Sequence, residues 1–303
     1  MIVSSRIFGI TVNGVKTDGF VPYADMLNHK RPRQTTWYYS DERQGFVIEA
    51  CDDIERGSQV YDSYGKKCNS RFFLNYGFIN PGNDANEVPL VIYLNQADSG
   101  YDIKMKLINE AKPFQKFRVV DNLDEKVMNE FLSWIRYVEF DGDLAQLYLA
   151  KNEAITEAQR RRQNNQQAED SEDSDDVDLQ DVFKGTSLKP VSLVNELKVW
   201  GRVEELARES LERYPSSLED DRTLLAEDDK ESKLSYNERN CVLFRVGEKE
   251  ILEFLVKSSK RMMMLGGLSQ KEAKKEVNKY DDFEGCMAYF KSVILPFLSS
   301  SSS

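Results

Sequence analysis

The sequence predicts an α+β protein in which a β-rich region is followed by a helical one, and three observations in its 303 residues support this. Short apolar runs separated by glycine, proline and Asn-Gly fill residues 1–95, which is typical of strands joined by tight turns. From about Tyr101 onward, apolar residues recur three or four positions apart, the period of a helix that packs on one face. An acidic segment with few residues to bury interrupts this helical part.

The β-rich region is expected to form one domain over residues 1–95. Runs of roughly four to eight apolar, aromatic or β-branched residues are the usual length of a strand. In chain order the runs lie within SSRIFGITV, GFVPYADML, TTWYY, GFVIEA, QVYDSY and VPLVIYL. We therefore expect short strands connected by loops, with the cluster at Trp37, Tyr38 and Tyr39 serving mainly for packing.

The helical region is expected to be all-α and to span residues 96–298. Val127, Phe131, Ile135 and Val138 recur at helical spacing, so their shared face should be buried. The same spacing continues through two later stretches, at Leu193, Leu197, Trp200, Ala207 and Leu211, and at Phe244, Ile251 and Leu255. These stripes predict a core of amphipathic helices.

The acidic segment covers residues 159–182 and reads QRRRQNNQQAEDSEDSDDVDLQDV, with eight carboxylates after Ala168. Such a segment gains too little hydrophobic stabilisation to offset the entropy lost on ordering, so we expect a disordered loop. The alternative is an acidic tract that binds a partner. The serine run at 299–303 is expected to be a frayed tail.

Composition narrows the class of protein. Apolar residues make up 40% and charged residues 31%, no run approaches the roughly 20 apolar residues of a membrane helix, and Met1 to Val12 lacks the order of a signal peptide. We therefore expect an intracellular protein that does not bind membranes, without distinguishing cytoplasm, nucleus or plastid. The net charge of −11 argues against a nucleic-acid partner, since phosphates are bound chiefly by lysine and arginine.

The cysteines and the single histidine argue against a metal site, a disulfide framework and hydrolase chemistry. The four cysteines form no C-x-x-C pair, and His29 is the only histidine in the sequence. A metal site or a disulfide framework is therefore not expected. Hydrolase chemistry of the Ser-His-Asp or Cys-His kind would have to use His29, and no G-x-S-x-G motif accompanies it.

The chemistry-bearing block runs from Phe20 to Phe78 and contains DMLNH, RGSQVYDSYG and CNSRFFLNYGF. Each piece alone is ordinary, because an Asn-His pair is often a turn and tyrosines in a β-rich domain are often half-buried packing. Their order and spacing resemble the C-terminal half of a SET domain, most closely that of the Rubisco large-subunit methyltransferase family. The helical segment ERNCVLFRVGEKEILEFL is similar to that family's C-terminal substrate-binding domain.

The resemblance implies a partial SET domain with a pseudo-knot, followed by the helical domain, and it implies roles for individual residues. Asn28, His29 and Phe78 would contact S-adenosylmethionine, and Tyr64 would contact it as the catalytic tyrosine. Ser5, Arg6, Asp25 and Tyr76 would lie near the substrate side chain. Methyl transfer needs alignment and an electron-rich channel more than it needs an acid, and tyrosines and carbonyl oxygens suit such a channel.

The implied activity is that of a protein-lysine N-methyltransferase, acting on a protein substrate and expected to be a monomer. A lysine must lose its proton to attack, which desolvation favours. Two alternatives stay open: a histidine acceptor, and a non-catalytic module that only docks a partner. The family's glycine-rich cofactor loop would precede residue 1, so we expect this chain alone to bind the cofactor weakly.

Overall fold

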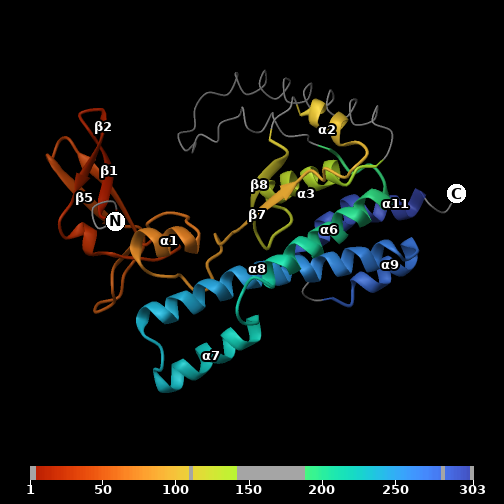
Figure 1. Ribbon diagram of the computed structural model, residues 1–303. Helices are drawn as coiled ribbons and strands as arrows, with labels where there is room; N and C mark the ends of the chain where they lie inside the picture. Colours follow the sequence, from red (N-terminus) through yellow and green to blue (C-terminus); the bar gives the residue numbers. More distant parts are fainter. Residues whose placement is uncertain (1–4, 109–111, 142–187, 281–283, 301–303) are drawn as a thin grey trace. The chain divides into compact units, whose positions relative to one another are not determined.

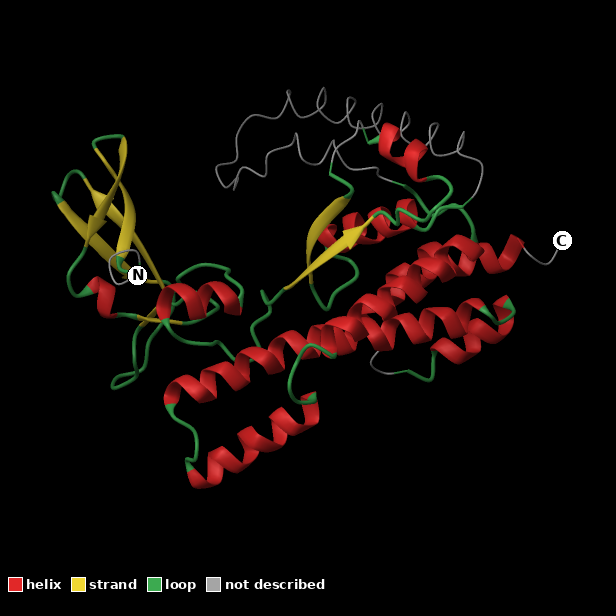
Figure 2. Cartoon of the chain, in the orientation of Figure 1, coloured by secondary structure: helices red, strands yellow, loops and turns green. Residues whose placement is uncertain are grey.

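The computed structural model describes residues 5–108, 112–141, 188–280 and 284–300, and it contains both strands and helices (Figures 1 and 2). The chain forms two compact units. The first comprises Met1–Asn86 and Glu227–Gly247, and the second comprises Glu87–Ala226 and Glu248–Ser303. The boundary thus lies nearer residue 86 than the expected residue 95, and a segment from the helical half belongs to the first unit.

Two antiparallel strands, β1 (Ile7–Val12) and β2 (Val15–Phe20), open the first unit. Val12 pairs with Val15, so only Asn13 and Gly14 form the turn, with φ of 50° and 79°. Asparagine and glycine are the residues that adopt positive φ most readily, which is why Asn-Gly makes a two-residue hairpin here.

A second hairpin pairs β4 (Thr35–Ser40) with β5 (Gly45–Ala50). The Trp37 ring lies 5.2 Å from Phe8 of β1 and 5.5 Å from Phe46 of β5, measured between ring centroids. These aromatic contacts join the two hairpins. The expectation that Trp37 serves for packing agrees with this arrangement.

A short parallel pair places two distant motifs side by side. Strand β3 (Asn28–His29) pairs with β6 (Tyr61–Asp62), so that Asn28 lies opposite Tyr61 and His29 opposite Asp62. A one-turn helix, η1 (Ala24–Met26), precedes β3. Helix α1 (Asn69–Tyr76) follows β6 and ends at Gly77, whose φ of 78° is the left-handed conformation that commonly ends helices.

The second unit contains a further strand pair, β7 (Val88–Tyr93) with β8 (Phe114–Val119), packed against helix α3 (Lys126–Val138). Helix α2 (Tyr101–Leu107) lies between the two strands in sequence. Strand β8 falls within residues 96–298, so that region is not all-α. The pairing also explains the shifted boundary, because β7 shares its hydrogen bonds with β8 rather than with the first unit.

The remaining elements are helical, and helices α7 and α8 each contribute residues to both units. Ser269 and Glu272 form a capping box at the start of α9, which satisfies two otherwise unpaired N–H groups. The helices are α6 (Leu193–Leu211), α7 (Leu218–Glu231), α8 (Tyr236–Gly266), α9 (Gln270–Val277), α10 (Glu284–Tyr289), a π-helical segment (Phe290–Ile294) and α11 (Leu295–Ser300).

Most residues of the helical stripes that the sequence indicated lie in the core of the second unit, together with residues of β7 and β8, whereas Phe244 belongs to the first unit. Phe131, Ile135, Trp200 and Leu255 are fully buried. Two buried ionic groups lie within this unit. Arg136 binds Glu196, with the Tyr289 hydroxyl bonded to both, and Lys249 of α8 binds Asp221 of α7 at 2.6 Å.

Several sequence predictions concern other parts of the chain. The acidic segment 159–182 lies outside the described residues, whereas Ser299 and Ser300 of the serine run fall within the bounds of α11. Within the described part of the chain, no disulfide joins any of the four cysteines. Among the described residues, no helix combines the length and apolar composition needed to cross a bilayer, and no cluster of three potential metal ligands is found.

Candidate active site

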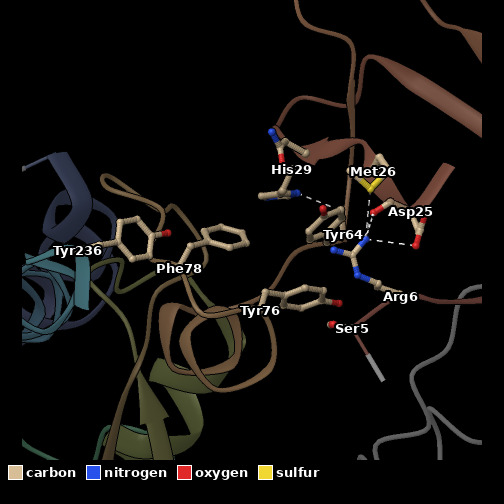
Figure 3. Close-up of a pocket in the computed structure, with 10 residues that line it drawn as sticks. Ser5, Arg6, Asp25, Met26, His29, Tyr64, Tyr76, Phe78 and Tyr236 are labelled. Carbon is tan, nitrogen blue, oxygen red and sulfur yellow. Dashed lines mark hydrogen bonds and ion pairs between the residues drawn. The ribbon is translucent and has the colours of Figure 1, made fainter. Parts of the chain in front are cut away.

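The first unit contains a pocket of about 430 Å³, drawn in Figure 3. All eight residues singled out in the sequence line it, although they come from four separate segments of the chain. Two further residues, Met26 and Tyr236, complete the lining. The eight are Ser5, Arg6, Asp25, Asn28, His29, Tyr64, Tyr76 and Phe78.

The β3–β6 pairing positions the centre of the pocket. Because His29 lies opposite Asp62, Tyr64 two residues further along comes beside the imidazole. The backbone N–H of Tyr64 donates to His29 Nδ1 at 2.9 Å, and the Tyr64 hydroxyl donates to the Leu27 carbonyl at 2.7 Å. Tyr64 is therefore tied at both its backbone and its side chain to the segment that carries Asn28 and His29.

These bonds assign the tautomer of His29. Since Nδ1 accepts a hydrogen bond, the proton of the neutral imidazole sits on Nε2. Nε2 is buried and has no hydrogen-bond partner among the residues that the structure describes. Burial lowers the pKa of His29 below its ordinary value, and the neighbouring positive charge of Arg31 lowers it further. His29, a residue that lines the pocket, thus carries a buried neutral N–H donor with no acceptor among the described residues.

Both pocket tyrosines keep their protons at neutral pH. Burial raises the pKa of Tyr64, with a further contribution from the neighbouring Tyr76, and burial also raises the pKa of Tyr76. The two rings stack with centroids 4.8 Å apart and planes inclined by 25°. Stacking fixes the direction of both hydroxyls without an ionic partner.

An aromatic wall continues from α1 into the residues after it. Phe72 of α1 lies 4.7 Å from the His29 ring and 5.1 Å from Phe78, again between centroids. The left-handed conformation of Gly77 turns the chain between Tyr76 and Phe78. Figure 3 shows Phe78 and Tyr236 on the opposite side of the pocket from Arg6 and Asp25.

The other side of the pocket is polar and charged. One nitrogen of the Arg6 guanidinium, Nη1, donates to the Asp25 carbonyl at 2.9 Å and to the Asp25 carboxylate at 3.2 Å. The same nitrogen lies 3.7 Å from the Met26 sulfur. With 43% of its side chain exposed, Arg6 forms a partly solvated rim, and it pairs the one carboxylate that lines the pocket.

Two lining residues were not anticipated from the sequence. Met26 lies within DMLNH but carried no separate signal. Tyr236 is the first residue of α8, and the Ser235–Glu238 bonds before it match the S-x-x-E pattern that begins helices. That pattern could have located the start of the helix, but nothing local indicates that Tyr236 reaches a pocket built from residues 5–78.

The arrangement suits a cationic, partly apolar ligand that must be aligned rather than cleaved. Three aromatic rings, those of Tyr64, Tyr76 and Phe78, offer electron-rich faces to a positive charge. The carboxylate of Asp25 already pairs with Arg6, so no free acid is placed for hydrolysis among the lining residues.

Solved structures with a similar fold include several of Rubisco LSMT. The structure of Rubisco LSMT bound to AdoMet matches with a TM-score of 0.56 and 22% sequence identity, over 94% of this chain and 58% of that one. The SET domain of LSMT bound to MeLysine and AdoHcy matches with a TM-score of 0.55 and 21% identity, over 86% and 53%. The predicted SET-type fold is therefore confirmed.

Curated relatives are more similar in sequence. Actin-histidine N-methyltransferase from Rattus norvegicus is 27% identical over 245 residues, and the protein of that name from Gallus gallus is 26% identical over the same length. Each alignment covers 80% of this chain but 36% of the relative. The chain thus spans about a third of the length of the curated relatives it matches.

The helical part supplies the family assignment. Residues 95–252, a little over half of the chain, match the family described as Rubisco LSMT substrate-binding. This range includes the R-x-G-E-K segment whose resemblance was noted in the sequence. The chain belongs to the Rubisco LSMT substrate-binding family.

Proposed function

We propose that this chain is the pocket-bearing part of an S-adenosylmethionine-dependent protein methyltransferase, and that the acceptor is a lysine side chain. The observation that carries the proposal is the convergence of the eight residues, from Ser5 to Phe78, on the same pocket. A SET-type fold and the methyltransferase relatives support the same conclusion.

The residues present fit the cofactor. When bound, S-adenosylmethionine supplies a methyl group on a positively charged sulfur. The faces of Tyr64 and Phe78 would hold that charge by cation–π attraction. The buried Nε2–H of His29 would donate to a polar atom of the cofactor, which satisfies its missing hydrogen bond. Asn28, exposed beside it on β3, would supply a second polar contact.

The chain's own groups would prepare the acceptor. A lysine entering between the tyrosine rings would be desolvated, which favours loss of its proton. The Tyr64 hydroxyl donates its own proton to the Leu27 carbonyl, so its oxygen lone pairs remain available to the amine. The raised pKa of Tyr64 keeps this hydroxyl neutral and its geometry constant across the pH range in which lysine begins to deprotonate. Arg6 and Asp25 would contact the substrate chain at the rim.

A histidine acceptor is the second candidate, and the curated relatives favour it by name. Two of the similar solved structures favour lysine, because they are described as bound to MeLysine and to Lysine. Both acceptors need a neutral nitrogen and the same alignment. They differ in the pH at which that nitrogen becomes neutral, since lysine has a pKa of roughly 10.4 and histidine roughly 6.5 in peptides.

The test is transfer of radiolabelled methyl from S-adenosylmethionine to protein by the full-length protein in which this sequence occurs. Total cell protein serves as the acceptor, and acid hydrolysis of the labelled product identifies methyl-lysine or methyl-histidine. Tyr64→Phe is expected to lower the rate by at least about 100-fold, because alignment contributes much of the barrier reduction. Tyr38→Phe is the matched control, since Tyr38 does not line the pocket and its hydroxyl donates to the exposed Glu49 carboxylate at 3.2 Å.

The pH dependence separates the acceptors independently. A lysine acceptor predicts a rate that keeps rising above pH 8, whereas a histidine acceptor predicts a plateau above about pH 7. If Tyr64→Phe transferred labelled methyl groups at the wild-type rate, Tyr64 would be excluded from the mechanism. Absence of any transfer by the wild type, with its fold intact, would instead favour a non-catalytic docking module.

A further inference from the structure

We propose that Asn69 is a positioning residue for the aromatic wall of the pocket, acting through a side-chain clip to Asn80. Asn69 lies in NSRFFLNYGF, and neither its side chain nor that of Asn80 lines the pocket. The kinetic part of this inference rests on the proposed function. The structural part does not, because it concerns only how the wall is held.

The clip is a pair of hydrogen bonds between a side-chain amide and a backbone. The Asn80 N–H donates to Asn69 Oδ1 at 3.1 Å, and Asn69 Nδ2 donates to the Asn80 carbonyl at 3.2 Å. The amide of Asn69 therefore pairs with the main chain of Asn80 much as a neighbouring strand would. Asn69 is 2% exposed, so water does not compete for these bonds.

The two clipped residues are the ends of the segment that carries the wall. Residues 69–80 comprise α1, Gly77 and the next three residues, and Phe72, Tyr76 and Phe78 all lie between the tied ends. Gly77 can adopt many conformations, because it lacks a Cβ. Apart from the clip, Gly77 is held by its own N–H, which donates to the Phe72 and Phe73 carbonyls, and by its carbonyl, which accepts from Asn240 Nδ2 at 3.5 Å. The clip is what ties the chain beyond Phe78 back to the start of α1.

Two more asparagines complete the cluster. Asn83 Nδ2 donates to Asn69 Oδ1 at 3.1 Å and to the Lys67 carbonyl at 2.8 Å, while Asn86 Oδ1 accepts from the Asn69 backbone N–H at 3.3 Å. Asn86 thereby caps α1, whose N-cap residue, Cys68, makes no side-chain hydrogen bond to the helix backbone. The side-chain oxygen of Asn69 thus accepts two hydrogen bonds, from the Asn80 N–H and from Asn83 Nδ2. A carboxylate at this position could accept both bonds, whereas an alkyl side chain could accept neither.

The 303-residue chain provides its own reporter, because His29 is its only histidine and its ring lies against Phe72. The imidazole proton resonances of histidine-labelled protein therefore report the placement of α1 through ring currents. Asn69→Ala is expected to move or broaden these resonances. Asn69→Asp, which keeps the acceptor but loses the donor, should move them less and serves if the alanine variant does not fold.

Two controls separate positioning from general loss of stability. Asn75→Ala changes the same helix outside the clip, and Val203→Ala removes buried volume in the second unit. Both should leave the His29 resonances at their wild-type positions even where they lower the melting temperature. The positioning role would be overturned if the His29 resonances were unchanged in folded Asn69→Ala. It would also be overturned if Val203→Ala moved them by the same amount.

The kinetic arm uses the full-length methyl-transfer assay. A displacement of the wall by about 1 Å predicts a fall in kcat of roughly 10- to 100-fold for Asn69→Ala, with Asn75→Ala near wild type. Wild-type kcat in Asn69→Ala despite moved His29 resonances would show that the wall does not govern catalysis and would overturn the kinetic part of the inference. If the wild type transfers no methyl group, the proposed function fails, and the resonances still decide whether the clip holds the wall.

Discussion

Gly247, in the R-x-G-E-K segment of α8, provides a sharp test of how the first unit is packed. A Cβ placed on Gly247 would lie 2.7 Å from Asn86 Nδ2 and 3.7 Å from Asn69 Nδ2. In an exposed helix interior, Gly→Ala stabilises by about 1 kcal/mol. Here Asn86 would have to move and release the backbone N–H of Asn69, and an unpaired buried N–H costs about 1–3 kcal/mol. Overpacking adds a further cost of about 1–3 kcal/mol.

We therefore expect Gly247→Ala to be destabilising by about 1 to 5 kcal/mol, against the helix-propensity trend. Gly201→Ala in α6 is the matched control, because its Cβ would meet only the Met263 sulfur at 3.9 Å, an ordinary contact. The free energy of unfolding of that variant should be higher by up to about 1 kcal/mol, which corresponds to a rise in melting temperature of about 2 °C in a protein of this size.

Differential scanning calorimetry measures both variants and shows whether the two units unfold together. The expected result is a shift of opposite sign for the two substitutions. A Gly247→Ala protein as stable as Gly201→Ala would refute the close approach of the asparagine cluster to α8.

Three further predictions concern other parts of the chain. Asp221→Ala leaves Lys249 buried at 1% exposure without its carboxylate, so urea unfolding should show a loss of about 3–5 kcal/mol, and a loss below 1 kcal/mol would contradict the buried pair. Because the pKa of His29 is lowered in the folded protein, the unfolded chain binds a proton more readily. The stability that the neutral imidazole contributes should be complete above about pH 6.5. It should be lost as the pH falls through the lower pKa of the folded state. As the pH is lowered from 7 to 5, the melting temperature should therefore fall less steeply for His29→Gln than for the wild type, and parallel curves would count against a depressed pKa. Ser269→Ala removes the capping box with Glu272 and should cost about 1 kcal/mol, measured by urea unfolding, whereas no change would show that the cap is unimportant to α9.

Much of the site was predictable because it lies in short motifs whose parts are joined by local structure. Asn28 and His29 occupy one strand of a two-residue parallel pair, so the position of Tyr64 follows once β6 is paired with β3. Tyr76 and Phe78 follow from the end of α1 at Gly77. What the sequence could not indicate was the pairing itself, since two residues on each side leave no periodic pattern.

The remaining differences have tertiary causes. Residues 227–247 read as part of the helical half, yet contacts such as Phe73 with Phe244 place them in the first unit. For the same reason Tyr236 could not be assigned to the pocket. Strand β8 interrupts a region of helical composition because it pairs with β7. With six residues, the strand is too short to change the helical spacing of apolar residues that the surrounding sequence shows.

A crystal structure of the full-length protein with S-adenosylhomocysteine would test the central claim most directly. The account predicts that the ligand lies in the pocket against His29, Tyr64 and Phe78, with a polar atom within hydrogen-bond distance of His29 Nε2. A ligand bound elsewhere, with Nε2 facing no ligand atom, would contradict it.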